Sequence, residues 1–356
     1  MNETLYMQRC LELAQKAKGH TAPNPMVGAV LVYNGHIIGE GYHKQYGQAH
    51  AEVNCLTSVS ETNRHLIPDS IMYVSLEPCA HYGKTPPCAT RIVAEGIKKV
   101  VIANTDPFEK VSGRGLQILR DAGIAVDIDI LDQEAAWVNR RFFTFHRHRR
   151  PYIILKWAQS PDGYIAPADS SRLQISNELS KRLVHKWRTE EAAIMIGTNT
   201  AINDNPQLTA RLWAGKQPLR ILLDRNLRVP SISNIYDTAT NTWVINELKE
   251  ERHDNIHFIK FNFDKNFLRS LSERLHKAGI LSVIIEGGTQ LLSSFIHEGL
   301  WDEARVFTGD ISLQNGISAP SLQNGILSFD TQLENNTLKL FTNKNSGYRY
   351  LPGLEL

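Results

Sequence analysis

Cysteine is scarce in this chain, and long apolar runs are missing. The 356 residues include only 4 cysteines, too few to form the disulfide framework of a small secreted protein. No apolar run approaches the roughly 20 residues that a membrane-spanning helix requires, and the first residues lack the apolar core of a signal peptide. We therefore expect a soluble, cytoplasmic protein with reduced thiols and no membrane segment.

A strong excess of charge of either sign is also missing, since the formal net charge is only +2. A nucleic-acid-binding domain usually has a pronounced basic face, so we expect a small-molecule partner and no nucleic acid. The length allows two domains, each with its own core. A basic run ends at Pro151 and is typical of a solvated linker, which predicts domains at residues 1–146 and 150–356.

Hydrophobic periodicity in the first half predicts a layered α/β domain. Helices are expected first at residues 3–18 and later after His50, after residues 86–87 and near 116–119; 57–69 is predicted to be a polar loop. Strands are expected at residues 27–33, at 36–38 across an Asn-Gly turn, and at 71–76, 99–103 and 124–130.

Within this pattern, His50, Cys79 and Cys88 have the chemistry of a zinc site. One imidazole nitrogen and two sulfurs leave the fourth tetrahedral position open for a water molecule, whose pKa the metal lowers. Glu52 follows the histidine by two residues, as does the proton-transferring glutamate of zinc deaminases. We therefore predict one catalytic zinc per chain, with Glu52 as the general acid and base.

Two other interpretations of these residues remain open. Unpaired cysteines are often buried core residues, and the two cysteines here are farther apart than in the P-C-x-x-C pattern. A closed structural zinc site would need a fourth protein ligand, for which His81 is the nearby candidate. Glu52 would then have no role, so the catalytic interpretation is favoured.

The second half predicts strands at residues 152–156, 192–196, 220–223, 243–245 and 281–285, with helices at 178–188 and 267–276 and after 288. Two of these strands end in glycine turns, at Gly197 and at Gly287-Gly288. Such turns at helix starts suit phosphate binding, although ordinary turns also use glycine. Neither turn has the G-x-G-x-x-G spacing, so we do not expect a Rossmann domain.

Several motifs in the same order resemble the bifunctional riboflavin-biosynthesis deaminase–reductases over nearly the whole chain. The first half has TAPNPMVGAV (residues 21–30), GYH (41–43), HAE (50–52), EPC (77–79), GKTPPC (83–88) and NTDP (104–107). The second half has KWA (156–158), SPDG (160–163), IGTNT (196–200), DNPQLTAR (204–211) and EGG (286–288).

The resemblance implies a cytidine-deaminase-like three-layer α/β/α domain followed by a dihydrofolate-reductase-like α/β domain. It implies zinc-dependent deamination of 2,5-diamino-6-(5-phosphoribosylamino)pyrimidin-4(3H)-one. It further implies reduction by NADPH of the ribosyl side chain of 5-amino-6-(5-phosphoribosylamino)uracil to ribityl. We also expect a homo-oligomer, either a dimer or a tetramer.

The resemblance also implies which residues contact substrate and cofactor. Lys156, Asp204 and Glu286 are candidates for orienting the sugar and supplying a proton. The arginines among the substrate contacts suit the 5-phosphate. The implied substrate contacts are Asn24, His43, Lys84, Asp106, Arg188, Leu208, Arg211 and Glu286. The implied NADPH contacts are Ala158, Thr200, Asp204, Arg225, Gly288, Thr289, Gln290, Leu291, Leu292, Ser293 and Ser294.

One segment departs from the family pattern, because Gln174 stands where the family often has tryptophan. This departure keeps open a second interpretation, in which the second half is a non-catalytic module that dimerises or binds a nucleotide. A deaminase that acts on a free nucleotide or on tRNA is a further rival. The near-neutral charge and the large second domain disfavour tRNA.

Overall fold

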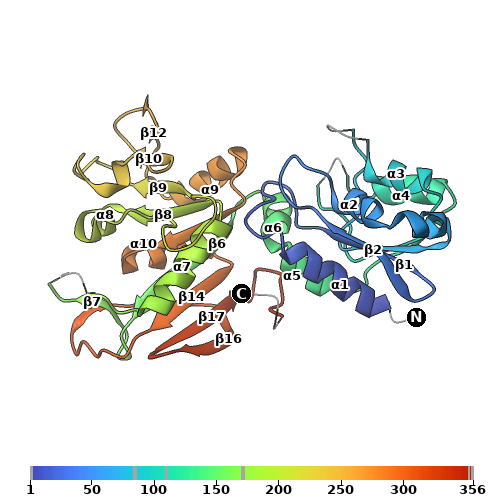
Figure 1. Cartoon of the computed structure of the whole chain (residues 1–356). Coiled ribbons are helices and arrows are strands. Elements are labelled where there is room, and N and C mark those ends of the chain that lie inside the picture. The colour runs from blue at the N-terminus through green and yellow to red at the C-terminus, as the bar shows by residue number, and fades with distance from the viewer. Residues whose placement is uncertain (1–2, 83–85, 109–110, 170–172, 352, 354–356) are drawn as a thin grey trace. The chain divides into compact units, whose positions relative to one another are not determined.

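The computed structural model describes residues 3–82, 86–108, 111–169, 173–351 and 353. The chain divides into two compact units, one up to His148 and the other spanning Arg149–Tyr350 (Figure 1). Among the described helices, none is long and apolar enough to cross a membrane.

The first unit contains a five-stranded sheet of mixed direction. Strand β1 is antiparallel to both of its neighbours, β2 and β3, whereas β3, β4 and β5 run parallel. The carboxyl ends of β3 and β4 therefore lie at one edge of the sheet. In sheet order the strands are β2 (His36–Tyr42), β1 (Gly28–Tyr33), β3 (Ile71–Val74), β4 (Lys99–Ile102) and β5 (Ala125–Asp127).

Helices cover both faces of this sheet and complete a three-layer α/β/α unit. Alternate strand residues face opposite sides, so Leu31 and Val74 pack with α2, α3 and α4, whereas Val30 and Val101 pack with α1 and α5. The helices are α1 (Glu3–Gln15), α2 (Ala51–Ser58), α3 (Cys88–Ala94), α4 (Arg114–Asp121), α5 (Asp132–Val138) and α6 (Arg140–His148).

Two predictions for the first half were wrong. The polar stretch at residues 57–69 is mostly helical, because η1, a 3-10 helix, spans Glu61–Asp69. The expected solvated linker is helix α6, in which Phe142 and Phe143 are buried. These two aromatic side chains supply the apolar face that the neighbouring basic residues obscure in the sequence.

The second unit contains a ten-stranded sheet whose seven central strands run parallel, with antiparallel strands at its flanks. In sheet order the strands are β11 (Glu251–His253), β12 (Ile256–Lys260), β10 (Thr242–Asn246), β9 (Leu219–Leu223), β8 (Ala193–Gly197), β13 (Ser282–Glu286), β6 (Tyr152–Gln159), β14 (Glu303–Thr308), β17 (Asn336–Asn343) and β16 (Gly325–Leu333).

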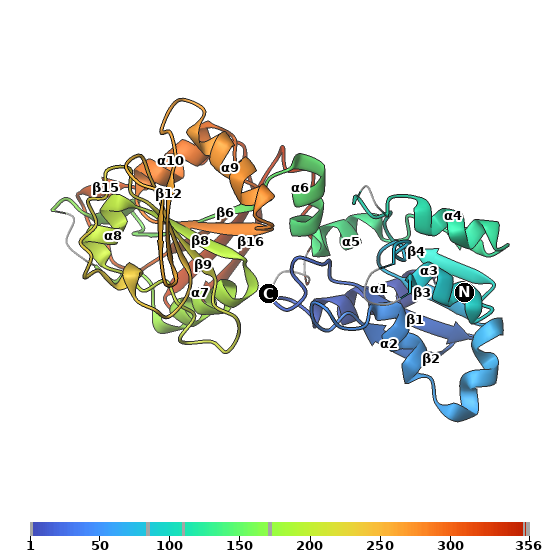
Figure 2. The ribbon, with the colours of Figure 1, turned by 90° about the horizontal axis from the view of Figure 1, so that it is seen from above.

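Helices lie on both sides of this sheet. Figure 2 shows α9 and α10 on one side of the strands and α7 on the other. Leu275 of α9 and Phe295 of α10 pack on Leu155 and Ile285, whereas Trp187 of α7 packs on Phe307 of β14. The helical elements are α7 (Glu178–Glu190), α8 (Thr198–Asp204), η2 (Asn234–Tyr236), α9 (Phe267–Lys277) and α10 (Thr289–His297).

A short antiparallel ribbon stands beside the main sheet of the second unit. It pairs β7 (Tyr164–Pro167) with β15 (Gly316–Ser318). Asp162 fixes one end, because its carboxylate accepts hydrogen bonds from the backbone N–H groups of Leu313 and Gln314 at 3.2 and 2.7 Å. These bonds anchor the segment that leads into β15 beside β7.

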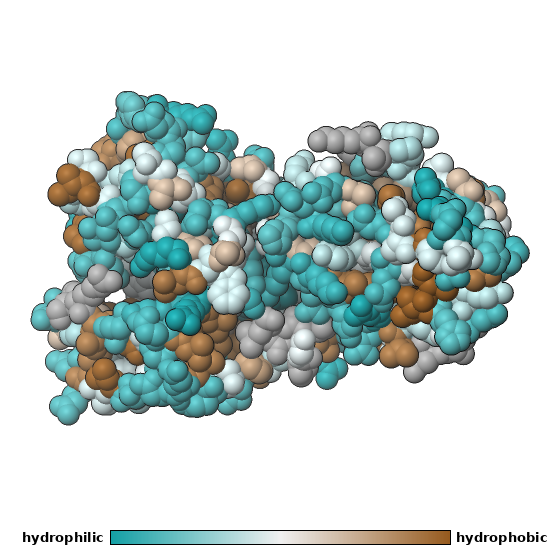
Figure 3. All heavy atoms as spheres, viewed as in Figure 1, coloured by the Kyte–Doolittle hydropathy of each residue, from teal (hydrophilic) through white to brown (hydrophobic). Residues whose placement is uncertain are grey.

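On the face shown in Figure 3, hydrophilic residues predominate and hydrophobic residues are scattered among them. Scattered apolar residues are normal on a protein surface. Open α/β sheets usually bind ligands at the carboxyl ends of their parallel strands, so the functional residues are expected there.

Candidate functional site

Three predicted metal ligands converge in the first unit. Nδ1 of His50 lies 3.5 Å from Sγ of Cys79 and 3.4 Å from Sγ of Cys88, and the three ligand atoms lie within 4.8 Å of one another. Zinc bonds of about 2.3 Å to sulfur and about 2.1 Å to nitrogen separate tetrahedral ligands by about 3.6 Å. The donor set and its spacing therefore fit zinc, as predicted from the sequence.

Local chain geometry explains why these three side chains meet. Cys79 follows β3 after a short turn, His50 is the N-cap of α2, and Cys88 is the first residue of α3. The backbone N–H of Cys88 donates to Sγ of Cys79 at 3.3 Å. A hydrogen bond with the side chain of Cys88, and next the contact with His50, lower the pKa of the Cys79 thiol. Thiolate is the form that binds a metal.

Glu52 lies in the first turn of α2 and is buried, with only 3% of its surface exposed. Burial, and next the sulfur of Cys79, raise the pKa of this carboxyl to about 7. Within the described residues, His50, Cys79 and Cys88 form a three-member ligand group that does not include Glu52. The predicted separation of roles, three ligands and one proton-transferring carboxyl, therefore agrees with the geometry.

The predicted substrate contacts Asn24 and His43 lie side by side next to the metal ligands. Nδ2 of Asn24 is 3.2 Å from Nε2 of His43, and Nδ1 of His43 is 3.1 Å from the carbonyl oxygen of Ala49. Burial lowers the pKa of His43, so this ring is neutral, with Nδ1–H donating and Nε2 accepting. The pair is held in one orientation, which leaves the amide oxygen of Asn24 as an acceptor for a ligand.

Asp106 follows β4 at the same sheet edge, and burial raises the pKa of its carboxyl to about 7. Glu77 holds this loop in place. Its buried carboxylate accepts backbone N–H bonds from Asp106, Gly113, Gly115 and Leu116 at 2.9 to 3.3 Å. Sequence reasoning gave Glu77 no role, because its partners lie about 30 to 40 positions away. Lys84, the remaining predicted contact, lies outside the described residues.

The second unit contains its own cluster of buried charges. Oε2 of Glu286 is 3.0 Å from Nη2 of Arg188 and 3.9 Å from Nζ of Lys156. Burial alone would raise the pKa of Glu286, but Arg188 and Lys156 outweigh it and lower that pKa. Burial lowers the pKa of Lys156. Oε1 of Glu286 and Nε of Arg188 are buried without a hydrogen-bond partner in the described structure, which fits a polar ligand.

A cavity of about 790 Å³ opens at this cluster. It extends between the carboxyl ends of the parallel strands and the ribbon of β7 and β15, with Gln174 in its wall. Most of the polar residues that line this cavity were predicted from the sequence as catalytic, substrate-binding or cofactor-binding residues. The predicted residues that line it are Lys156, Ala158, Arg188, Thr200, Asp204, Leu208, Glu286, Gly288, Thr289 and Gln290.

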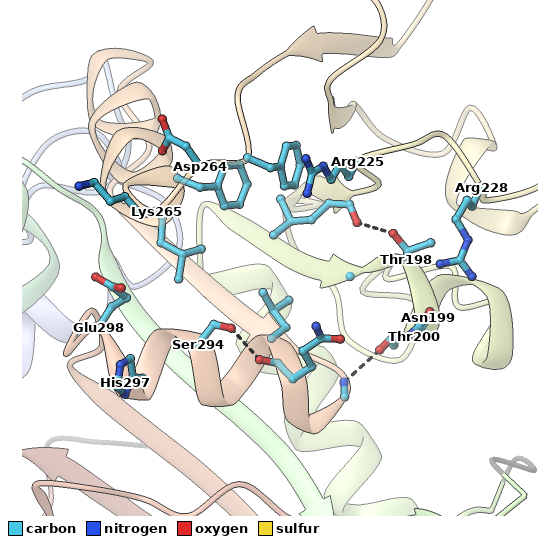
Figure 4. Close-up of a pocket in the computed structure, with 18 residues that line it drawn as sticks. Thr198, Asn199, Thr200, Arg225, Arg228, Asp264, Lys265, Ser294, His297 and Glu298 are labelled. Atoms are coloured by element: carbon cyan, nitrogen blue, oxygen red, sulfur yellow. Dashed lines mark hydrogen bonds between the residues drawn. The ribbon is translucent and has the colours of Figure 1, made fainter.

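A second cavity, of about 500 Å³, shares Asn199, Thr200, Gly288 and Gln290 with the first (Figure 4). The predicted cofactor residues Arg225, Leu291 and Ser294 line this second cavity. Three predicted residues of the second unit line neither cavity: Leu292 is fully buried in the core, Ser293 is half-buried on α10, and Arg211 is exposed.

The two cavities meet at a backbone turn that suits a phosphate-bearing cofactor. Gly287 has a φ of +126°, and a Cβ there would lie 2.7 Å from Oγ1 of Thr200. The same oxygen accepts a hydrogen bond from the N–H of Gly288 at 3.0 Å. The N–H groups of the first turn of α10 follow Gly288 and have no acceptor within the helix, which suits a phosphate. The residues present therefore fit a dinucleotide that extends through both cavities.

Similarity to known proteins that contain both units shows the family to which this chain belongs. Residues 1–104 match the cytidine and deoxycytidylate deaminase zinc-binding region, and residues 151–325 match the RibD C-terminal domain. The riboflavin biosynthesis protein RibD of Aquifex aeolicus is 40% identical over 92% of this chain and 92% of its own length. The chain belongs to the RibD family. RibD of Bacillus amyloliquefaciens is 39% identical over 91% of this chain and 88% of its own length.

Solved structures agree with this assignment. A diaminohydroxyphosphoribosylaminopyrimidine deaminase/5-amino-6-(5-phosphoribosylamino)uracil reductase from Thermotoga maritima has a TM-score of 0.86. It is 31% identical, with 96% of this chain and 98% of that chain covered. Acinetobacter baumannii RibD, form 1, has a TM-score of 0.86 and 33% identity, with coverages of 96% and 99%.

Membership of the RibD family confirms the predicted fold and the predicted pair of activities. The chain is a bifunctional deaminase and reductase of riboflavin biosynthesis, with a cytidine-deaminase domain followed by a dihydrofolate-reductase-like RibD reductase domain. The His50, Cys79 and Cys88 cluster is its zinc-binding region, and the reductase domain implies NADPH. Its substrates are small molecules of the riboflavin pathway.

Proposed function

We propose that the chain converts 2,5-diamino-6-(5-phosphoribosylamino)pyrimidin-4(3H)-one in two steps. The first removes an amino group by hydrolysis, and the second reduces the ribosyl side chain of the product, 5-amino-6-(5-phosphoribosylamino)uracil, to ribityl. The observation that carries the proposal is the buried Glu52 beside an open cluster of His50, Cys79 and Cys88. A purely structural metal site would have no use for that carboxyl.

In the first step, Glu52 transfers the protons. Zinc in this site supplies an activated water molecule for hydrolysis. Glu52 would take a proton from that water and give it to the ring nitrogen as the hydroxyl adds to the ring carbon. It would then take the proton of the added hydroxyl and give it to the amine, so that the C–N bond breaks and ammonia leaves as a neutral molecule. Asn24, Asp106 and the neutral His43 line this end of the sheet and suit the amide-like edge of an aminopyrimidinone. Lys84 is the proposed partner of a phosphate.

In the second step, the buried charges around Glu286 orient the sugar. NADPH supplies the hydride that converts the ribosyl side chain to ribityl. The unpaired Oε1 of Glu286 accepts a hydrogen bond from a sugar hydroxyl. Lys156 supplies the proton that accompanies the hydride, and its lowered pKa favours this proton transfer. Asp204 lines the same cavity and is a further orienting group.

Two arginines are proposed to hold the 5-phosphate of the sugar. Nη1 of Arg188 donates to the carbonyl oxygen of Thr209 at 3.1 Å, which fixes the segment that leads to Arg211. Arg211 is exposed and near enough to contribute to the electrostatic field at His185. Guanidinium groups bind phosphate through paired hydrogen bonds, and Leu208 forms a buried apolar wall beside them.

The assignment of steps to parts of the chain is also proposed. Residues 1–146 would carry the deamination and residues 150–356 the reduction.

The four free cysteines suit a reducing compartment such as the cytoplasm. Strand β16 lies at an edge of the sheet, where Ile326 and Leu327 are 54% and 50% exposed. These exposed apolar side chains support a homo-oligomer, either a dimer or a tetramer.

Paired variants test the proposal. Glu52→Gln should abolish ammonia release from the diamino substrate, yet leave NADPH oxidation with the deaminated uracil unchanged. Glu286→Gln should show the opposite pattern, because each carboxyl serves only one step. Ammonia and NADPH absorbance are measured on the same preparations, with zinc content as the control for an intact first site. Ammonia release by Glu52→Gln at the wild-type rate would refute the role of Glu52.

A further inference from the structure

Asn139 stands between α5 and α6 and has no role in the chemistry described above. It is buried, with 3% of the residue exposed. We propose that Asn139 is a positioning residue for deamination, which holds the loop that presents Asn24 to the pyrimidine ring. This proposal rests on the substrate contact of Asn24 proposed above. It concerns the binding of the substrate, since the proton transfers remain with Glu52.

The side-chain amide of Asn139 pairs with the backbone of a single residue, Met26. Oδ1 of Asn139 accepts a hydrogen bond from the N–H of Met26 at 2.8 Å, and Nδ2 donates to the carbonyl oxygen of Met26 at 2.8 Å. A carboxamide has the donor and the acceptor of a peptide group, so Asn139 bonds to Met26 as a neighbouring strand would. The two residues are 113 positions apart, and the pairing therefore forms only in the folded unit.

Asn139 is itself fixed at the junction of two helices. Its N–H donates to the carbonyl oxygen of Ala135 at 3.1 Å, and its carbonyl oxygen accepts from the N–H of Phe143 at 2.9 Å. These bonds join the last turn of α5 to the first turn of α6. Val138, next to Asn139, and Phe143 are both buried. The amide is therefore a rigid attachment point for the loop before β1.

The chain between Met26 and Asn24 is short and stiff. Pro25 separates the two residues, and its ring fixes φ near about −65°. A proline also restricts the backbone of the residue before it, which is Asn24. The N–H of Asn24 donates to the carbonyl oxygen of Thr21 at 2.8 Å and closes the preceding turn. A displacement of Met26 would therefore also displace Asn24.

The side chain that contacts Asn24 in the site is held from a different helix. Nδ2 of Asn54, on α2, donates to the carbonyl oxygens of Tyr42 and Ala49 at 2.8 and 3.2 Å. Nδ1 of His43 lies 3.1 Å from the same oxygen of Ala49. His43 therefore keeps its place when the loop of Asn24 moves, and the 3.2 Å contact between the two side chains is lost.

The expected effect of this displacement is on substrate binding. The amide oxygen of Asn24 is the acceptor proposed for the pyrimidinone edge, and that contact exists both before and during the reaction. Loss of a contact that is made equally in the ground state and the transition state raises KM and leaves kcat largely unchanged. Partial unfolding or loss of zinc would instead lower the apparent kcat, because fewer molecules are active, and would leave KM unchanged.

Two variants of the full chain test the role of the amide. Asn139→Ala removes both bonds to Met26, so the KM for the diamino substrate should rise about tenfold while kcat changes less. Asn139→Asp has nearly the same shape. Its protonated carboxyl can donate and accept, as the amide does, whereas its carboxylate can only accept. The KM of Asn139→Asp relative to wild type should therefore rise with pH, and that of Asn139→Ala should not.

Tyr6→Phe is the matched control in the same unit. It removes a hydrogen bond from a side chain to backbone, that of the Tyr6 hydroxyl to the carbonyl oxygen of Gly35 at 2.7 Å. This bond lies beyond the end of β1 that is opposite Met26. Ammonia release is measured from mildly acidic to mildly basic pH, with zinc content determined for each protein. Tyr6→Phe should keep the wild-type KM throughout.

Two results would overturn the positioning role while the proposed deamination stands. One is a wild-type KM in Asn139→Ala together with a KM ratio of Asn139→Asp that does not change with pH. The other is a rise of KM in Tyr6→Phe equal to that in Asn139→Ala, since general loosening of the unit would then explain both. No ammonia release by the zinc-loaded wild-type protein would instead refute the proposed substrate, and the inference with it.

Discussion

His185 lies one helical turn before Arg188 on α7, and both side chains hold the segment around Arg211. Arg188 donates to the carbonyl oxygen of Thr209 at 3.1 Å, and Nδ1 of His185 accepts from the N–H of Leu212 at 3.4 Å. Only a neutral imidazole can accept that bond. Burial, followed by the charges of Arg188 and Arg211, lowers the pKa of His185 to about 4.

This shift predicts a pH dependence of stability. The folded pKa of about 4 lies below the ordinary value of 6.5, so the unfolded chain binds more protons between these values. The contribution of His185 is therefore fully present above pH 6.5 and is lost as the pH falls towards 4. His185→Gln, whose amide oxygen can also accept from Leu212, should lose less unfolding free energy than wild type between neutral pH and pH 5, by about 1 to 2 kcal/mol.

Urea unfolding of both proteins at the two pH values measures this difference, because every other titrating group contributes equally to both. Parallel losses in the two proteins would show that His185 is already protonated in the fold. The KM for the phosphoribosyl substrate at the two pH values provides a second measurement. Protonation of His185 in wild type would break its bond to Leu212 and displace the Arg211 segment, which should raise KM more than it lowers kcat.

Local motifs made some of these residues predictable and left others undetected. The zinc ligands and Glu52 were predicted because their residue types and order carry the chemistry. Glu77 and His185 were missed, since their partners come from distant loops and their roles lie in hydrogen bonds to backbone. Leu292 was expected at the cofactor but belongs to the core, because α10 turns that side chain onto the sheet.

At the scale of elements, the turn between β13 and α10 controls the cofactor site. Gly287→Ala would require a strained positive φ and would push Cβ against Oγ1 of Thr200, whose hydrogen bond positions Gly288. We expect NADPH affinity to fall by about tenfold or more, measured by titration of the full chain. Gly279→Ala is the control, since Gly279 also has positive φ, at +77°, but no atom within 4 Å of an added Cβ.

The control should lose about 1 kcal/mol of stability and keep the affinity of wild type for NADPH. Equal affinity losses in both variants would mean that backbone strain alone, and not the contact with Thr200, explains the effect. Ammonia release should be unchanged in both variants, because neither glycine lies in the first unit.

Elements with a regular apolar pattern were predicted, and those whose pattern depends on distant partners were not. The central strands of both sheets and helices α2, α7 and α9 agree with the expected positions. Strand β14 was missed because it contains buried charges: Arg305 binds Glu303 at 2.6 Å and Glu191 at 3.5 Å. Such residues resemble an exposed strand in the sequence until their partners are known.

At the scale of the whole molecule, each unit has its own core and its own site. Metal removal should therefore separate the activities. A chelator that strips zinc should abolish ammonia release and destabilise the first unit, while NADPH oxidation with the deaminated uracil continues. Adding zinc back should restore ammonia release. Loss of both activities, with recovery of both on zinc addition, would contradict independent sites.

The most direct test of the two-step assignment is one time course with wild-type protein, the diamino substrate and NADPH. Ammonia and NADPH absorbance are recorded together on the same sample. We predict that ammonia appears first and that NADPH then falls by one equivalent per ammonia, while omission of NADPH leaves ammonia release intact. NADPH consumption that precedes or proceeds without ammonia release, or ammonia release never followed by NADPH loss, would contradict a chain that deaminates and then reduces.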